Sequence, residues 1–176
     1  LDALEPFGFG HVFPRGTLRE PVAGLRRADV VVLSRADMVA PEVRQQIREE
    51  ALRHAPEAVW AEVCHAPQVL LNSSGQRQAL ETLRDQPVAL FCGIGNPSGF
   101  LHTAGTCGYR VVGRREFADH YRYGRDDVES LRRWADDLEV VAVLCTHKDL
   151  VKLDLDRLGA RPLWALSVGL EFLAGE

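Results

Sequence analysis

The stretch Val88–Val112, VALFCGIGNPSGFLHTAGTCGYRVV, decides the fold of this chain. It opens on a continuous apolar run, Val88–Cys92, which is typical of a strand buried on both faces of a sheet. Asn96 and Pro97 then form a good helix start, and Gly108 is a typical residue at a helix end. A second apolar segment follows directly. Strand, helix and strand in this order predict two parallel strands joined by a crossover helix.

The same alternation continues on both sides of this stretch. We expect further strands at Ala28–Leu33, Ala58–Ala61, Val140–Cys145 and Leu163–Val168. A helix opens at Pro41 and runs to about His54, because apolar residues recur there on one face. Asp126 and Glu129 resemble a capping box and predict the start of another helix. Alternating strands and helices predict an α/β fold with a mostly parallel sheet.

The predicted elements fall into three segments. Residues 1–62 are the first segment. The first ~70 residues supply only about two clear core strands, so we expect an unpaired strand edge or an exposed apolar face there. Residues 63–75 form a two-stranded linker in which Val63–His65 pairs with Gln68–Asn72 around Ala66-Pro67. Residues 76–176 form a smaller, Rossmann-like three-layer α/β domain.

Composition narrows the class of protein. The 176 residues are 46% hydrophobic and carry a net charge of -4, which suits a folded core and argues against broad binding to nucleic acid. No apolar run reaches the ~20 residues of a membrane span, and no signal peptide is visible. The chain starts at Leu1 and its only methionine is Met38, so we expect a fragment. Four scattered cysteines fit a reducing, cytoplasmic location.

Three polar loops follow predicted strands of the second half. They are Gly93–Asn96, Glu116–Tyr123 and Thr146–Asp149. Ligands of open α/β sheets bind at the carboxyl ends of the strands, so we expect these loops to converge on one edge. His120 beside Asp119 can accept a proton from a hydroxyl group, since the pKa of histidine lies close to neutrality. The alternative is a surface turn with a solvated histidine.

The other two loops are candidate anion sites. Lys148 can contact a phosphate as a mobile charge, and we group Asp149 with it as a substrate-binding residue, although Asp149 also suits the first turn of a helix. Gly93, Gly95 and Asn96 join a strand to a helix N-terminus, where free amides bind anions such as a nucleotide phosphate. A tight turn with a good cap explains the same residues.

A further candidate lies near the start of the chain. Arg15, Arg19 and Glu20 belong to an irregular loop, and arginine forks bind phosphate or carboxylate. The alternative is that the arginines pair with neighbouring acids. The histidine and cysteine spacings predict no metal site.

Four segments together resemble the tetraacyldisaccharide 4′-kinase family. Gly8–Pro21 resembles the family loop GxGN…LPAGPLREP, Phe91–Pro97 resembles FCGIGNP, Phe117–Tyr123 resembles FPDHHxY, and Thr146–Lys152 resembles TxKDxVK. Their joint order and spacing are specific, and the match covers nearly the whole chain. The departures are His11 for Asn, Arg15 for Ala, Thr17 for Pro, and Tyr121 for the second His.

The resemblance implies a partial phosphate-binding-loop-kinase-like core in residues 1–62, followed by the α/β domain. It implies transfer of the ATP γ-phosphate to the 4′-hydroxyl of tetraacyldisaccharide 1-phosphate, a precursor of lipid A in Gram-negative bacteria. His120 then matches the family's catalytic histidine, and Arg19 matches an arginine that contacts phosphate. The GxxxxGKS/T motif and the Mg²⁺-binding segment are absent, so ATP and Mg²⁺ are expected to bind mainly upstream and this chain to be inactive alone.

The family also implies a location. We expect a peripheral enzyme on the cytoplasmic side of the inner membrane, attached through the upstream part, with this fragment soluble. The partner is the lipid A disaccharide precursor, and no nucleic acid is expected. Two alternatives stay open: a non-catalytic α/β binding module, and a degenerate GTPase-like regulator suggested by Ser34-Arg35-Ala36-Asp37.

Overall fold

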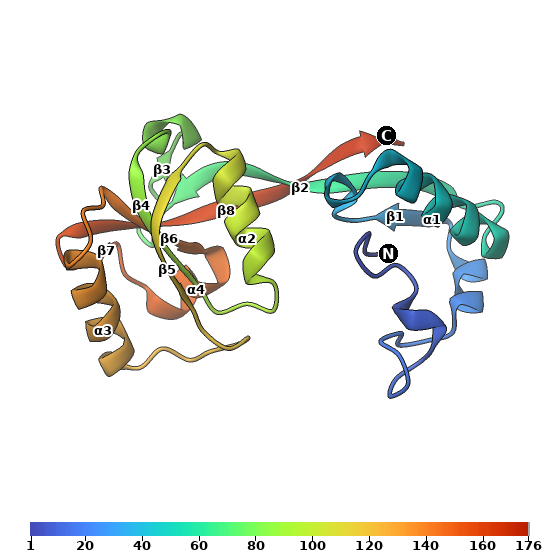
Figure 1. Cartoon of the computed structure of the whole chain (residues 1–176), viewed down its shortest axis with the longest axis horizontal. Helices are drawn as coiled ribbons and strands as arrows, with labels where there is room; N and C mark the ends of the chain where they lie inside the picture. Colours follow the sequence, from blue (N-terminus) through green and yellow to red (C-terminus); the bar gives the residue numbers. More distant parts are fainter. Residues whose placement is uncertain (176) are drawn as a thin grey trace. The chain divides into compact units, whose positions relative to one another are not determined.

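The strands of the chain are shared between two units. The computed structural model describes residues 1–175 (Figure 1). The first unit is Leu1–Ala66 together with the end of the chain from Leu170, and the second is Pro67–Gly169. The chain passes from one unit to the other within β2 (Val59–Leu71) and returns within β8 (Arg161–Ala174). Over the described residues, no helix is long and apolar enough to cross a membrane.

The second unit holds a parallel sheet in the order β8-β6-β4-β5. Its other strands are β4 (Pro87–Cys92), β5 (Arg110–Glu116) and β6 (Ala142–Thr146). Its helices are α2 (Pro97–Thr106), α3 (Arg125–Asp136) and α4 (His147–Leu153). Strands and helices alternate along the chain, as the apolar runs predict.

Helices cover both faces of this sheet. Val88 and Leu90 of β4 pack with Phe100 of α2 on one face. Ala89 and Phe91, which alternate with them along the strand, pack with residues of α3 and α4 on the other face. The predicted three-layer α/β architecture is therefore confirmed.

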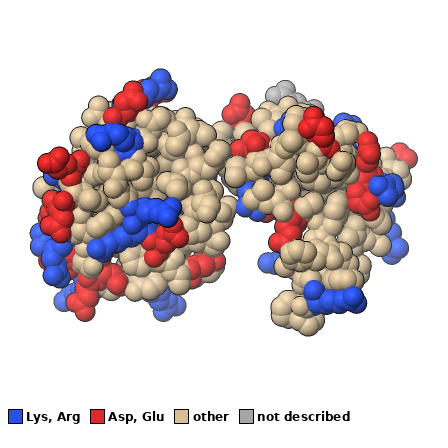
Figure 2. Space-filling model, in the orientation of Figure 1, with Lys and Arg blue, Asp and Glu red and all other residues tan. Residues whose placement is uncertain are grey.

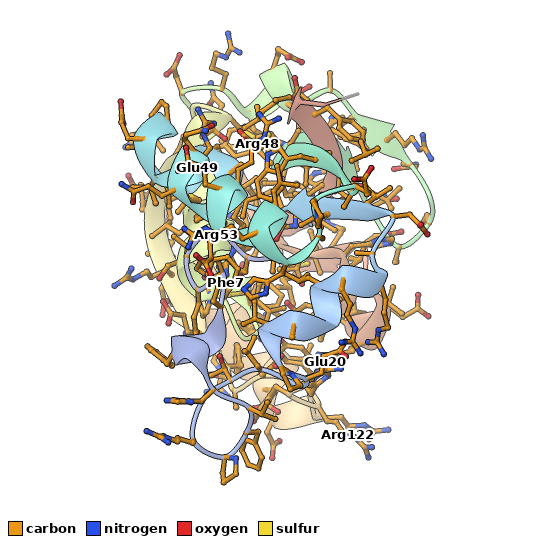
Figure 3. The ribbon with its side chains drawn as sticks, turned by 90° about the vertical axis from the view of Figure 1, so that its right-hand side faces the viewer. Phe7, Glu20, Arg48, Glu49, Arg53 and Arg122 are labelled. Atoms are coloured by element: carbon orange, nitrogen blue, oxygen red, sulfur yellow. The ribbon has the colours of Figure 1, made fainter. Side chains whose placement is uncertain are left out.

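The first unit has a helix on one face of a parallel pair. β1 (Val30–Leu33) pairs with the start of β2, and α1 (Pro41–His54) connects them. Ile47 and Ala51 of α1 pack against Leu33 and its neighbours. The opposite side of α1 carries charged side chains, among them Arg48, Glu49 and Arg53 (Figure 3). The predicted bounds of this helix are confirmed.

The face of β1 and β2 opposite α1 is not covered by any described element of this unit. Val30, Val32 and Val59 have 53%, 37% and 58% of their surface exposed. The outer edge of β1 is partly paired, because the Leu1 amino group donates to the Val32 carbonyl at 2.8 Å and Leu1–Ala3 continues alongside. The expectation of an exposed apolar face is confirmed, whereas a fully unpaired edge is not found.

The predicted pairing of Val63–His65 with Gln68–Asn72 around Ala66-Pro67 is wrong. One continuous strand, β2, passes through both residues, and its turn comes later, before β3 (Arg77–Gln78). β1 accompanies β2 only over Val59–Glu62, and β3 only at Leu70 and Leu71. Pro67 lies between these stretches, where its missing N–H group breaks no bond to β1 or β3; β8 is the remaining neighbour of β2 in the sheet.

Two predicted element ends also need correction. α3 begins one residue before Asp126, so that the Gly124 amide donates to the Asp127 carboxylate at 2.8 Å and Glu129 takes no part in the cap. The last strand, β8, runs well beyond Val168. Short pieces complete the chain: β7 at Arg157–Leu158 and 3-10 turns at Gly8–Gly10, Val22–Arg27, Ala36–Met38 and Leu80–Leu83.

Candidate functional site

Three loops meet at one edge of the second unit's sheet. β4, β5 and β6 run parallel, so their carboxyl ends lie together. Gly93–Asn96 follows β4, the segment Phe117–Gly124 follows β5, and α4 directly follows β6. A Cβ atom placed on Gly95 would lie 3.3 Å from Asp119 Oδ2, so the first two loops are in contact. This arrangement agrees with the predicted convergence of the polar loops.

The carboxylate of Asp149 lies buried beneath this edge. Its Oδ2 accepts hydrogen bonds from the Gly93 amide at 3.1 Å and from the Thr146 hydroxyl at 2.7 Å. Its Oδ1 accepts from the Tyr123 hydroxyl at 3.0 Å, and Lys152 Nζ lies 3.6 Å away. The side chain of Asp149 is completely buried. One carboxylate thus connects the segments after β4, β5 and β6.

Burial beside this carboxylate shifts neighbouring groups. The pKa of the Tyr123 hydroxyl is raised, first by desolvation and then by the charge and hydrogen bond of Asp149. Desolvation and the same charge raise the pKa of the Cys92 thiol to about 11. Both groups therefore stay protonated at neutral pH, which agrees with the prediction that Cys92 is a small core residue.

Aromatic rings hold the loop after β5 against the sheet. The ring of Phe91 meets Phe117 and Tyr123 edge to face, with centroids 6.4 and 5.9 Å apart. Tyr121 packs against Phe117 at 4.9 Å, and its hydroxyl donates to Asp127 at 3.1 Å. Tyr121, which departs from the family motif, therefore contacts the start of α3 through its hydroxyl group.

Asp119 and His120 form the open tip of this loop. The side chain of His120 is 85% exposed, and its Nε2 lies 3.8 Å from Asp119 Oδ2. The backbone of His120 is left-handed, with φ of 59°, and its amide donates to Asp119 Oδ1 at 2.9 Å. An imidazole that solvent reaches, at the carboxyl edge of a parallel sheet, is suited to accept a proton.

The remaining predicted residues of this edge differ in whether a ligand can reach them. Lys148 is exposed, as a charge contact requires. Asp149 is enclosed by donors of the protein, so the expectation that it touches substrate is contradicted. The Gly93 amide is used by Asp149, and the Asn96 side chain accepts from the Gly99 amide at 3.1 Å. The protein's own carboxylate thus occupies the place at Gly93 where an external anion was expected.

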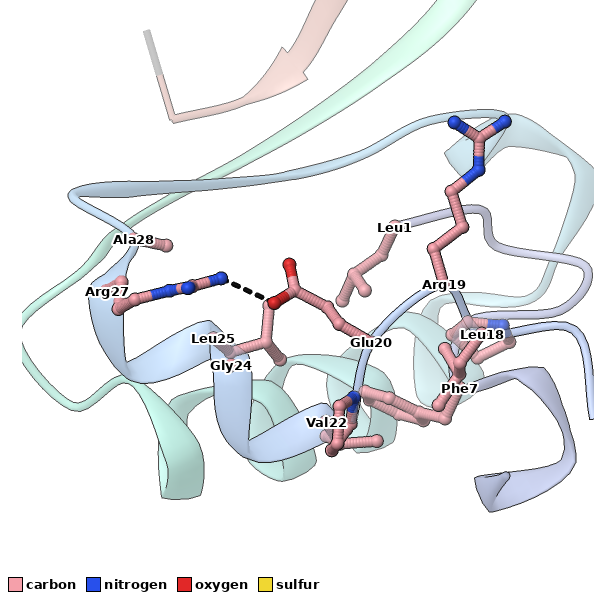
Figure 4. Close-up of a pocket in the computed structure, with 12 residues that line it drawn as sticks. Leu1, Phe7, Leu18, Arg19, Glu20, Val22, Gly24, Leu25, Arg27 and Ala28 are labelled. Atoms are coloured by element: carbon pink, nitrogen blue, oxygen red, sulfur yellow. Dashed lines mark hydrogen bonds and ion pairs between the residues drawn. The ribbon is translucent and has the colours of Figure 1, made fainter. Parts of the chain in front are cut away.

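The first unit carries the other candidates, in a loop built on close backbone contacts. A Cβ atom on Gly16 would come within 2.2 Å of the His11 carbonyl oxygen. Arg15 is exposed at this turn. Arg19 and Glu20 line a cavity of about 440 Å³ whose other walls are mostly apolar, and Glu20 pairs with Arg27 (Figure 4). The carboxylate of Glu20 is therefore paired with a guanidinium of the same unit, that of Arg27.

Two further predictions concern nucleotide and metal binding. Arg35 forms a two-pronged ion pair with Asp2, with Nε donating at 2.9 Å, so its guanidinium is held away from the role of a base-recognition residue. Over residues 1–175, no group of three or more His, Cys, Asp or Glu side chains is placed to hold a metal. Acidic and basic side chains are interspersed on the visible face of each unit (Figure 2).

Sequence reasoning missed the partners of Asp149. Tyr123 and Thr146 both lie within the quoted motifs, but the motifs assign neither of them a role. A signal was present for Thr146, because a threonine three residues before an aspartate often starts a helix, and Thr146 does cap α4. No local pattern pairs Tyr123 with Asp149, which is 26 residues away in the sequence.

Comparisons with known proteins agree with this architecture. The family model described as tetraacyldisaccharide-1-P 4′-kinase matches residues 1–176. A tetraacyldisaccharide 4′-kinase of Anaeromyxobacter sp. strain K is 41% identical over 99% of this chain and 47% of its own length. One from Halothermothrix orenii is 33% identical over 89% of this chain and 43% of its own length. The chain spans about half the length of these curated relatives.

A solved structure shares the fold. The ATP complex of LpxK from Aquifex aeolicus aligns with 98% of this chain and 46% of its own, with a TM-score of 0.64 and 23% sequence identity. This likeness confirms the predicted α/β class. On the match of its full length to the family model, the chain belongs to the tetraacyldisaccharide-1-P 4′-kinase family.

Proposed function

We propose that this chain belongs to a lipid kinase that uses His120 as its general base. The kinase transfers the γ-phosphoryl group of ATP to the 4′-hydroxyl of tetraacyldisaccharide 1-phosphate. The observation that carries the proposal is the exposed His120 imidazole beside Asp119, at the carboxyl edge of a parallel sheet, in a chain of this family.

The chemistry assigned to His120 is proton acceptance. The 4′-oxygen attacks the γ-phosphorus, the new O–P bond forms as the bond to the β-phosphate bridging oxygen breaks, and ADP leaves. His120 takes the hydroxyl proton, and the carboxylate of Asp119 stabilises the imidazolium. Arg15 and Arg19 suit the 1-phosphate of the lipid, since a guanidinium binds phosphate with two parallel hydrogen bonds. Lys148 supplies a further positive charge.

ATP and Mg²⁺ do not fit the described residues of this chain. Its sequence has no GxxxxGKS/T motif, and the buried carboxylate of Asp149 is already surrounded by protein donors. We therefore assign both to the part of the relatives' length that this chain does not span, together with attachment to the cytoplasmic face of the inner membrane.

The test compares the chain alone with an extended enzyme. In the extended enzyme, the part of the Anaeromyxobacter sp. strain K kinase that this chain does not match is fused to this chain in the order of the relative. Transfer of ³²P from ATP to tetraacyldisaccharide 1-phosphate is expected from the extended enzyme and not from the chain alone. His120→Ala should lower kcat about 10²–10⁴-fold and leave the KM for ATP nearly unchanged.

The matched control is His54→Ala, which changes a histidine of α1 whose Nε2 lies 3.3 Å from Glu50 Oε1 in the same helix. Its kcat should equal that of the unmodified enzyme. Metal-dependent ATP turnover by the chain alone would contradict the assignment of ATP to the part of the relatives' length that this chain does not span. A near-normal kcat for His120→Ala would favour the alternative of a non-catalytic module.

A further inference from the structure

Asp149 has no assigned role in the chemistry, yet it is the charged side chain that the described fold buries completely. Burying a carboxylate is costly unless its oxygens are satisfied by hydrogen bonds. Here the donors come from three different segments: Gly93 after β4, Tyr123 after β5, and Thr146 at the end of β6. A buried charge placed at such a junction fixes the segments relative to one another.

The loop that carries His120 depends on this junction at its far end. At its near end, the Phe117 amide donates to the Cys92 carbonyl at 2.9 Å, continuing the pairing with β4. At its far end, the Tyr123 hydroxyl donates to Asp149, three residues after His120. Between these anchors the Asp119–His120 tip is exposed. The Asp149 carboxylate therefore limits how far the tip moves. It does so through contacts inside the protein alone.

We propose that Asp149 is a positioning residue, which holds the Phe117–Tyr123 loop on the sheet edge through Tyr123 and thereby keeps His120 in place. Its consequence for catalysis rests on the proposed function, whereas its effect on the loop does not. An asparagine cannot replace it. In one amide orientation the NH₂ group faces the Gly93 N–H, and in the other it faces the Lys152 ammonium group, so a donor always meets a donor.

The first test uses the chain itself and trypsin. Arg122 lies exposed within the loop, and Arg157 lies exposed elsewhere in the same unit. Asp149→Asn should raise the rate of cleavage after Arg122 roughly tenfold, because an unsatisfied buried donor favours the detached loop. Tyr123→Phe keeps the ring and loses one hydrogen bond, so roughly a threefold rise is expected. Cleavage after Arg157 should not change in either variant.

The matched control is Asp154→Asn. This aspartate follows α4, is exposed, and has a left-handed backbone that asparagine adopts readily. Its cleavage pattern should equal that of the unmodified chain. The proposal is overturned if Asp149→Asn behaves like Asp154→Asn, or if cleavage after Arg122 and Arg157 rises equally, which indicates general loss of stability. If Asp149→Asn does not fold, Tyr123→Phe decides by the same comparison.

A double-mutant cycle in the extended enzyme tests the link to His120. Asp149→Asn alone should lower kcat roughly tenfold with the KM for ATP unchanged, since an anchor of the loop is lost. Added to His120→Ala it should change kcat little, because both act through one group. Equal effects in both backgrounds refute the positioning role. An inactive extended enzyme refutes the proposed function instead and leaves the trypsin result standing.

Discussion

Two of the loops that carry candidate residues are held mainly by different kinds of contact. The loop of the first unit, from Gly8 to Leu18, is tied by backbone hydrogen bonds, such as the Leu18 amide to the His11 carbonyl and the Phe13 amide to the Leu18 carbonyl. The loop of the second unit, Phe117–Tyr123, is held largely by rings and by two phenol–carboxylate bonds. The first therefore needs particular glycines, and the second needs particular side chains.

The largest effect is expected from removing the ring beneath the second loop. Phe91 is completely buried and packs edge to face against Phe117 and Tyr123. Phe91→Ala should lower the free energy of unfolding of its unit by about 3–5 kcal/mol, as cavities left by aromatic residues do. Urea unfolding measures this.

Phe13→Ala is the matched control in the first loop. Phe13 is 78% exposed, so its removal should change the free energy of unfolding by no more than ~0.5 kcal/mol. Similar losses in the two variants would contradict the contrast between the loops.

The second prediction concerns a glycine that the backbone of the first loop requires. A Cβ atom on Gly16 would lie 2.2 Å from the His11 carbonyl oxygen and 2.3 Å from that of Gly8. Gly16→Ala should therefore destabilise the first unit by about 1–3 kcal/mol, since backbone must shift. Gly105→Ala in α2 meets no atom within 4 Å and should stabilise its unit by about 0.5–1 kcal/mol. Thermal unfolding of both variants, followed by circular dichroism, gives the comparison.

The contrast also explains how far the sequence predicts this molecule. Apolar runs such as Val88–Cys92 and the cap at Asn96 are local, so the strands, helices and parallel edge of the second unit follow from them. The course of β2 depends on which distant strands lie beside it. Pro67 suggests a turn in the sequence, but β2 continues through it. The burial of Asp149 also depends on distant partners, which neither its motif nor its helix position reveals.

The third prediction uses pH to probe the phenol–carboxylate bond of the second loop. Folding raises the pKa of Tyr123, so the folded state keeps a proton that the unfolded chain releases above about pH 10. Stability is therefore lost as pH rises beyond that value, by at most ~1.4 kcal/mol per pH unit from this group. Tyr123→Phe should make the fall in the free energy of unfolding between pH 9.5 and 11 shallower, with a difference in slope that approaches ~1.4 kcal/mol per pH unit at the upper end of this range. An unchanged slope would show that Tyr123 is not held in this bond.

The smallest effect is expected where the turn after β4 meets the second loop. A Cβ atom on Gly95 would lie 3.3 Å from Asp119 Oδ2, a tight contact with the end of a half-exposed side chain. Rotation of that carboxylate relieves the contact, so Gly95→Ala should change the free energy of unfolding by less than ~0.5 kcal/mol. In the extended enzyme the moved carboxylate should lower kcat only several-fold, far less than His120→Ala does. Steady-state kinetics of both variants measure the difference, and a loss as large as that of His120→Ala would mean that the turn fixes Asp119 and, through it, the histidine.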